Sequence, residues 1–442
     1  MRFRSIRRLV TAVLVVAGVC VATVPSLALG GQRAKTAQAP VQITFWSWVP
    51  DIQTEVNQFN ASHPDIQVNY VNAGQGETEY QKLTTAIQAG SGAPDVVQVE
   101  YQYIPQYVAL HGLANIAKDI PAGTGSKFVS SVWQQVSPNS KTVWAIPQDS
   151  GPLGMLYRQD IFQQNGLTVP KTWAQFAADA IKLHKANPSD YLADFPVNDG
   201  GAIESMFWQA GAVPFQVKGN TVTIKIDDPA SMKVAEFWGK LIGAGDIATE
   251  PDYSTAWYTA LGNGTYASMT PAAAWAPVFL EGIDKSTSGS WRAAAVPQWS
   301  AKGKPINGDW GGSTTAVTAQ SKYPKQAAEF ATWLNTNAQT TSEFANSQSL
   351  YPTLKSLVNS PSFADQPISF YGGQEVNKVF AQASTAVNKK FQWSPFMSEV
   401  YTVLQDQIGD AAQGSESFAQ AMKNTQSQIV SYAKQQGFTV KT

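Results

Sequence analysis

Cysteine is almost absent from this 442-residue chain, because Cys20 is the only one. A single cysteine cannot form a disulfide within the chain, so the stability of the fold must come from buried apolar area. Histidine is also scarce, and His63, His111 and His184 lie far apart. No histidine or cysteine pair has the spacing of metal ligands, so we expect no metal site.

Several motifs of catalysis and nucleotide binding are missing too. The sequence has no Walker phosphate loop, no G-x-S-x-G nucleophile elbow and no G-x-G-x-x-G after a strand. One S-x-x-K, from Ser431 to Lys434, lacks companion motifs and is attributed to chance. We therefore expect no catalytic residue and no cofactor.

Basic residues are few beyond the N-terminus. Residues 1–40 hold six of the 31 basic residues and none of the 32 acidic ones, so the remainder has 25 basic residues and a net charge near −7. Only Arg158 and Arg292 are arginines there. Nucleic acids are bound mainly through basic side chains, and arginine is the preferred partner of carboxylate and phosphate. We expect no nucleic-acid partner and a neutral ligand.

The N-terminus has the pattern of an export signal. Four arginines in residues 1–8 precede the apolar run from Leu9 to Val24, which is shorter than the roughly 20 residues of a membrane span. We expect residues 1–40 to be a signal peptide and tether, and the mature protein to be secreted or extracytoplasmic. Cleavage after Ala28 is one possibility, and attachment to the outer face of the cell membrane through Cys20 is another. Arg7-Arg8 leaves twin-arginine export open.

Strand and helix patterns alternate along the mature chain. Apolar spacing predicts strands at residues 42–45, 66–70, 95–99 and 222–226, and helices at residues 50–59, 80–87, 103–110, 172–183, 228–242, 324–334 and much of 374–437. Thr172 and Gln175 form a capping box in this reading. Such alternation implies an α/β fold with parallel pairing, and about 400 residues exceed one typical core.

Aromatic residues recur where strands end or loops turn, as Trp46, Trp48, Tyr101 and Trp275 do. Ligands of open α/β sheets bind beyond the carboxyl ends of strands. A sugar needs flat aromatic surface for its apolar faces and fixed polar groups for its hydroxyls. In the stretch DWGGSTT, Asp309 would accept hydrogen bonds, Trp310 would stack, and the two glycines after it would let a ligand approach the main chain. Core packing explains Trp46 equally well, and it explains the helical tryptophans Trp133, Trp173, Trp238 and Trp333 better.

The order of several segments resembles the family 1 extracellular solute-binding proteins, the maltose-binding-protein-like sugar-binding proteins of ABC transporters. The segments are Ile43-Thr44-Phe45-Trp46-Ser47-Trp48, Gly92-Ala93-Pro94-Asp95-Val96-Val97, Ile146-Pro147-Gln148-Asp149, Leu156-Tyr157-Arg158-Gln159-Asp160-Ile161-Phe162, Pro170-Lys171-Thr172-Trp173, and Gly311-Gly312 before Ala327-Ala328-Glu329-Phe330. Each motif is weak alone, but their order and spacing together are fairly specific.

The resemblance implies a two-lobe periplasmic-binding-protein-like fold of type II, each lobe a mainly parallel sheet flanked by helices. The N-terminal lobe would be residues 41–148 plus about 313–350, and the C-terminal lobe residues 153–307 plus about 351–442. The chain would cross a hinge near residues 147–152 and 308–313. Ligand-binding positions carried over or picked from the aromatic pattern are Trp46, Trp48, Glu100, Tyr101, Asp149, Ser150, Trp208, Trp275, Asp309, Trp310, Gly311, Gly312 and Trp393.

The expected function is that of the binding component of an ABC importer. A monomer would capture a neutral sugar or oligosaccharide between its lobes and deliver it to permease subunits in the membrane. Two alternatives stay open. One is a secreted carbohydrate-active hydrolase or lyase, for which Glu77 and Glu79 are the nearest carboxylate pair, although a solvated helix start explains them better. The other is a binding protein for a cationic or peptide solute.

Overall fold

The structure, a computed structural model, describes residues 39–442. The expected signal peptide and Cys20 lie outside the described residues. Within residues 39–442, no helix combines the length and the hydropathy needed to cross a membrane.

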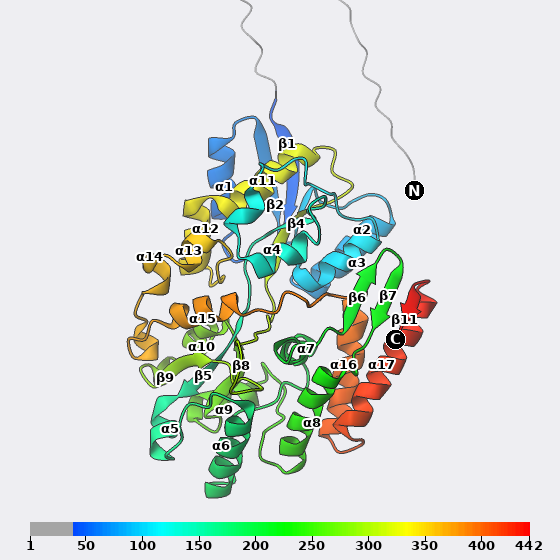
Figure 1. The fold of residues 1–442 in the computed structure, drawn as a ribbon. Helices are drawn as coiled ribbons and strands as arrows, with labels where there is room; N and C mark the ends of the chain where they lie inside the picture. Colours follow the sequence, from blue (N-terminus) through cyan, green and yellow to red (C-terminus); the bar gives the residue numbers. More distant parts are fainter. Residues whose placement is uncertain (1–38) are drawn as a thin grey trace, which may run out of the picture. The chain divides into compact units, whose positions relative to one another are not determined.

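A five-stranded sheet, here the first sheet, has the strand order β2-β1-β3-β10-β4. Its strands are β1 (Val41–Trp46), β2 (Ile66–Val71), β3 (Val96–Glu100), β4 (Ala145–Pro147) and β10 (Ser313–Val317). The helices in the same stretches of chain are α1 (Gln53–Ser62), α2 (Glu77–Gln88), α3 (Ile104–Ala109), α4 (Ser130–Val136), α11 (Pro324–Thr336) and α12 (Ala338–Ser347) (Figure 1). Phe45 of β1 meets Phe330 of α11 edge to face, with ring centroids 5.1 Å apart, which ties α11 to the sheet.

The remaining strands form two three-stranded sheets. The second sheet has the order β8-β5-β9 and consists of β5 (Leu153–Arg158), β8 (Ser268–Ala273) and β9 (Trp291–Ala295). The third sheet has the order β11-β7-β6 and consists of β6 (Phe215–Lys218), β7 (Thr221–Ile224) and β11 (Thr439–Lys441).

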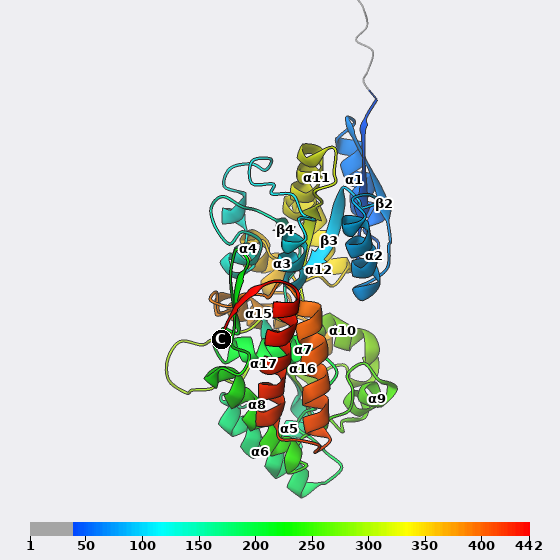
Figure 2. The same cartoon turned by 90° about the vertical axis from the view of Figure 1, so that its right-hand side faces the viewer.

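Helices make up most of the chain around these two sheets. They are α5 (Gln159–Gln164), α6 (Trp173–Ala186), α7 (Gly200–Gln209), α8 (Pro229–Gly243), α9 (Thr255–Asn263), α10 (Ala276–Ile283), α13 (Lys355–Val358), α14 (Pro361–Ala364), α15 (Val376–Thr385), α16 (Met397–Ala412) and α17 (Phe418–Gln435). The long helices α16 and α17 run side by side and pack on α8 (Figures 1 and 2). The capping box predicted at Thr172 and Gln175 is confirmed at the start of α6.

Strand direction differs from the expectation of mainly parallel sheets. β1 is parallel to β2 and β3, as expected, but β10 is antiparallel to β3 and β4, and β5 is antiparallel to β8 and β9. The reason is where the chain enters each sheet. β5 begins at Leu153, opposite the last residue of β8, and β10 begins at Ser313, opposite the last residue of β3. A strand whose first residue lies opposite the last residue of its neighbour is antiparallel to that neighbour.

Separate apolar cores surround the sheets. The first core is built from β1 to β4, β10 and their helices, and contains Ile43, Phe45, Val97 and Phe330. The second sheet packs in two further clusters, one of them around Trp173 and Trp238 and the other around Trp257 and Trp291. Trp173 and Trp238 are buried as predicted, while Trp133 and Trp333 lie partly buried against the first core.

Candidate ligand-binding site

Among the chain segments that pass between the first and second sheets, two are fastened to each other. The first crossing is residues 147–152 and the second is residues 308–313. The N–H of Gly151 donates to Asp309 Oδ1 at 2.6 Å, and the N–H of Ser313 donates to Asp149 Oδ1 at 2.7 Å. The Trp310 N–H also donates to the Gly151 carbonyl at 2.8 Å. Each crossing therefore supplies one carboxyl group that binds the main chain of the other.

Glycine is required where the crossings touch. A Cβ on Gly151 would overlap the carbonyl oxygen of Trp310, and one on Gly312 would come within 2.9 Å of the Asp149 carbonyl oxygen. Gly311 and Gly312 also have φ values of 77° and 95°, in the left-handed region that glycine adopts without strain. In this structure the glycines of the DWGGSTT stretch let two crossings pack together.

Burial changes the acidity of both crossing carboxyl groups. It raises the pKa of Asp149 to about 7, against the lowering effect of the Ser313 N–H, and Glu100 raises it further. Burial raises the pKa of Asp309 to about 8; the Gly151 N–H lowers it and the nearby Asp149 raises it. Asp309 Oδ2 and the Tyr101 hydroxyl are buried without a hydrogen-bond partner. Polar atoms in and beside the crossings thus lack a hydrogen-bond partner within the protein.

A second group of carboxyl groups approaches the same region from both cores. Glu100 ends β3, and Tyr80 Oη donates to its Oε2 at 3.0 Å. Asp199 caps α7 by accepting from the Ala202 N–H at 2.8 Å. Burial raises the pKa of both groups, and the negative charge of Asp199 contributes to the shift of Glu100. A carboxyl group of the first core therefore lies near one from α7.

Glu204 extends this group along α7. It is 2% exposed, and burial raises its pKa to about 8 while a hydrogen bond from Tyr401 lowers it. Tyr103, just after β3, lies close to Ser398 of α16, so this contact also joins the two halves. Basic side chains are not among the groups that shift the pKa values of Glu100, Asp149, Asp199, Glu204 or Asp309.

Aromatic rings flank these carboxyl groups. The Trp275 indole donates to the Trp310 carbonyl oxygen at 3.0 Å, and the two rings lie 5.0 Å apart at 68°. Trp310 is 6% exposed, and its indole lies near Asp199 and lowers the pKa of that carboxyl group. Trp48 follows β1 and meets Tyr80 edge to face at 5.7 Å. The structure thus brings Trp48, Glu100, Tyr101, Asp149, Ser150, Trp275 and residues 309–312 into one connected set.

Three of the expected positions do not join this set. Trp208 is 1% exposed, stacks on Phe391 at 4.2 Å and donates to the Asn388 carbonyl. Trp393 packs on Trp208 and donates to Gln135 Oε1 of α4 at 2.8 Å, so it bridges the two halves at another place. Trp46 is the last residue of β1 and packs against the first core.

Sequence reasoning missed several residues of the set. Asp199, Glu204 and Tyr401 lie on or before helices, where no strand end marks them. One signal was present: Asp199-Gly200-Gly201 repeats the acid-and-two-glycines pattern of Asp309 to Gly312. Tyr253 was missed too; its φ of 66° is unusual for an aromatic residue, and its side chain is 41% exposed beside Trp257.

Glu79 requires a correction. It was read as part of a solvated helix start, but it is fully buried, both its oxygens lack partners, and burial raises its pKa to about 8. The helix periodicity placed Tyr80 and Leu83 inward, and the buried face extends one residue further than that pattern. Glu79 and Glu77 therefore do not form a solvated pair.

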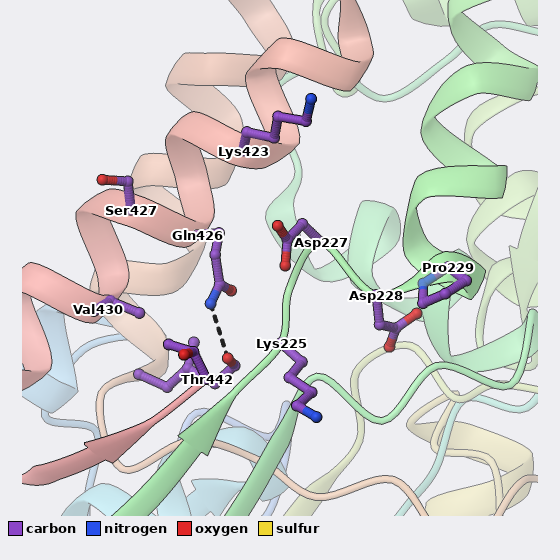
Figure 3. A pocket seen from close by; sticks show the side chains of 10 residues that line it. Lys225, Asp227, Asp228, Pro229, Lys423, Gln426, Ser427, Val430 and Thr442 are labelled. Atoms are coloured by element: carbon purple, nitrogen blue, oxygen red, sulfur yellow. Dashed lines mark hydrogen bonds between the residues drawn. The ribbon is translucent and has the colours of Figure 1, made fainter.

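A separate hollow of about 510 Å³ lies at the C-terminal end of the chain, between α17 and the segment that joins β7 to α8 (Figure 3). Its lining mixes Lys225, Asp227, Asp228 and Lys423, and Gln426 Nε2 donates across it to the Ile224 carbonyl at 2.8 Å. Asp228 already caps α8. Because its charges are balanced and both Asp228 and Gln426 are already hydrogen-bonded to the main chain, we place the ligand site at the crossings instead.

Comparison with known proteins gives a consistent result. The model of the bacterial extracellular solute-binding protein family matches residues 46–341. The chain is 27% identical over 314 residues to a lactose-binding protein of Rhizobium radiobacter, covering 67% of this chain and 70% of that protein. It is 24% identical over 307 residues to an arabinooligosaccharide-binding protein of Halalkalibacterium halodurans, covering 66% of this chain and 67% of the other.

Solved structures show the same fold. An ABC-transporter-associated binding protein of B. animalis subsp. lactis, in complex with β-1,6-galactobiose, aligns with a TM-score of 0.77 and 30% identity over 91% of this chain and all of that one. The galacto-N-biose/lacto-N-biose I-binding protein of Bifidobacterium longum, in complex with lacto-N-biose, aligns with a TM-score of 0.79 and 27% identity over the same shares. The expected two-lobe α/β fold of type II is confirmed by this likeness.

Proposed function

We infer the function from one premise: the chain belongs to the bacterial extracellular solute-binding protein family. We propose that it is the extracytoplasmic sugar-binding component of an ABC importer. Relatives and structural neighbours named for lactose, arabinooligosaccharide, β-1,6-galactobiose and lacto-N-biose support a carbohydrate ligand. No reaction is part of the proposal: the ligand is bound and released unchanged.

The observation that carries this proposal is the connected set of carboxyl groups and indole rings at the crossings. Glu100, Asp199 and Glu204 offer carboxyl oxygens to a ligand, and burial raises the pKa of each, which shifts the group toward its neutral form. Neutral carboxyl groups donate as well as accept hydrogen bonds, as sugar hydroxyls do. Trp48 and Trp275 are half-buried and leave ring surface for the apolar faces of a sugar.

We propose that the two crossings form the hinge and that the cores on either side are the two lobes. A sugar between Glu100 and Asp199 would contact both lobes at once. It would shift the equilibrium toward the closed form by the difference in its affinity for the closed and open forms. The closed form would then be the state that the permease subunits recognise. We retain lobe boundaries of 41–148 plus about 313–350, and 153–307 plus about 351–442, as part of this proposal.

Localisation follows from the family. The description of the family as extracellular, together with the N-terminal pattern, supports a protein outside the cytoplasm. We propose that Cys20 either leaves with the signal peptide or carries a lipid. Mass spectrometry of the protein purified from its native membrane fraction distinguishes a lipidated N-terminal cysteine from a chain cleaved after Ala28.

The test is calorimetry of the mature protein against lactose, β-1,6-galactobiose, lacto-N-biose, arabinobiose and maltose, with chromatography of each mixture after incubation. We expect saturable binding of at least one sugar, which is recovered unchanged. Spermidine is included because a cation would also satisfy these carboxyl groups. Binding of spermidine and of none of the sugars would show that the ligand is a cationic solute. Release of monosaccharide would show that the protein is a hydrolase.

A further inference from the structure

A small, partly enclosed cavity lies in the C-terminal lobe behind Trp310. Its free space is about 10 Å³, which is room for one water-sized group. Apolar side chains form most of its wall, namely Pro196, Trp257, Met269, Pro271 and Trp310, and the polar lining consists of Asp194, Asp252 and Thr270. Trp310 belongs both to this cavity and to the ligand site at the hinge.

The carboxyl groups of Asp194 and Asp252 are neighbours, and burial raises the pKa of both. Both are more than nine-tenths buried. The Trp257 indole donates to Asp194 Oδ2 at 3.0 Å, which satisfies that oxygen. Asp252 is held through its main chain, because its N–H donates to Asn198 Oδ1 at 2.9 Å and its carbonyl accepts from Asn198 Nδ2 at 3.2 Å.

One oxygen of this pair has no partner. Asp252 Oδ1 is buried and accepts no hydrogen bond. The other polar group of the lining, the Thr270 hydroxyl, is already paired with the Ser268 hydroxyl at 3.0 Å. A buried oxygen without a partner is costly, and a bound water needs two to four polar partners to replace its bonds in bulk solvent. The cavity offers a single free acceptor among apolar walls, which suits a hydroxyl attached to carbon better than a water.

We propose that this cavity is a subsite for the hydroxyl of an exocyclic hydroxymethyl group, and hence that the protein prefers hexose units to pentose units. This inference rests on the proposed sugar-binding function. Among the groups of a pyranose, only the hydroxymethyl group carries its hydroxyl one carbon beyond the ring. The hydroxyl donates to Asp252 Oδ1, and its methylene group lies against Trp310 while the ring remains at the hinge.

The experiment uses lactose, or lacto-N-biose where that sugar binds more tightly, and its two monodeoxy derivatives that each lack one hydroxymethyl oxygen. Affinities for the wild-type protein are measured by calorimetry. A site built to hydrogen-bond a hydroxyl discriminates strongly against the analogue that lacks it. We expect one derivative to bind at least tenfold more weakly than the parent sugar and the other to bind nearly as well.

Two variants assign the loss to Asp252. Asp252→Ala removes the acceptor, so the parent sugar and the affected derivative should bind within about threefold of each other, whereas Asp252→Asn keeps an acceptor oxygen and should keep the preference. Thermal unfolding shows which variants fold, and the wild-type measurements need no variant. If both derivatives bind the wild type as tightly as the parent sugar, or if Asp252→Ala keeps the preference, the subsite is refuted while sugar binding stands. Failure of every sugar in the panel refutes both.

Discussion

Buried carboxyl groups in two parts of this molecule have pKa values raised by burial and different hydrogen-bond partners. At the hinge, Asp149 and Asp309 each bind a main-chain N–H of the opposite crossing. In the second part, Glu100 accepts a hydrogen bond from the Tyr80 hydroxyl, and Glu204 Oε2 is buried without a hydrogen-bond partner. We infer that the hinge pair stabilises the fold, while the second group is available to a ligand. A raised pKa does not distinguish these two roles, and the hydrogen-bond partner does.

The largest effect is expected for a substitution in the crossings, and it is an effect on stability. Gly151→Ala should lower the free energy of unfolding by at least about 3 kcal/mol, because its Cβ would overlap the Trp310 carbonyl and separate the crossings. Denaturant unfolding measures this change. Gly409→Ala is the matched control, since a Cβ there meets nothing within 4 Å in the last turn of α16, and it should stabilise the protein by up to about 0.5 to 1 kcal/mol. Equal stability of both variants would contradict the tight packing of the crossings.

Asp309→Ala should destabilise the protein by about 1 to 3 kcal/mol, because it leaves the buried N–H of Gly151 without an acceptor. Asp309→Asn keeps an acceptor oxygen and should cost clearly less. Both are compared by denaturant unfolding at pH 6. If Asp309→Asn were the more damaging change, the role of Asp309 would lie in its charge and not in the crossing bond.

The pH dependence of stability sharpens the same comparison. Asp149 and Asp309 have an ordinary pKa of 3.8, raised by burial to about 7 and about 8 in the folded protein. Between about pH 4 and pH 8 the folded state therefore holds protons that the unfolded state has lost, so stability falls as the pH rises. Asp309→Asn should flatten this slope by up to about 1.4 kcal/mol per pH unit, the slope of one proton. Unfolding measured from pH 5 to pH 8.5 checks the sign, and a slope that the variant leaves unchanged would contradict the assignment.

Substitution of a carboxyl group in the second part should change sugar affinity and leave stability nearly unchanged, the opposite of what we expect at the crossings. Glu100→Gln is expected to weaken sugar binding roughly tenfold, the effect of about one lost hydrogen bond, while changing the free energy of unfolding by less than about 1 kcal/mol. Calorimetry and denaturant unfolding on the same preparation give both numbers. Glu236→Gln, at an exposed position on α8, should change neither. If the Glu100→Gln variant loses stability but keeps its sugar affinity, Glu100 stabilises the fold and does not bind the sugar.

The smallest effect is expected at the bridge between α4 and Trp393. Gln135→Ala removes the acceptor of the Trp393 indole, a contact that joins the lobes away from the hinge. Losing it should destabilise the closed form by about 0.5 to 1.5 kcal/mol and reduce sugar affinity several-fold, with little change in unfolding. Gln382→Ala, at an exposed position on α15, is the control. An affinity equal to that of the wild type would show that this bridge forms in the open state as well.

Much of the fold follows from local patterns in the sequence. Alternating apolar residues predicted β1 and β2, and the Thr172 capping box predicted the start of α6, because these signals depend only on neighbouring residues. The strand directions in the second sheet could not be predicted from these local patterns. The direction of β5 depends on where the chain enters the sheet after the first crossing, which alternation of strands and helices does not encode.

The candidate site was predictable where a strand end or a distinctive turn sequence marked it. Glu100 was found at the end of a strand and Asp309 in the DWGGSTT stretch, whereas Asp199 begins a helix after a loop and has no strand end to mark it. The direction of an aromatic ring is a further limit. Trp208 and Trp275 both looked like ligand positions, but Trp208 stacks on Phe391, a residue 183 positions later in the chain, and only tertiary structure reveals that contact.

The mutual fastening of the crossings has a mechanical consequence. Because carboxyl and main-chain groups bind the two segments to each other, they form a short rigid rod, and bending must occur in the backbone torsions at either end of it. In the proposed closure, each lobe would rotate about a fixed axis without breaking those bonds. The free energy released by ligand contact would then drive rotation of the lobes, and none of it would be needed to break and re-form the hydrogen bonds between the crossings.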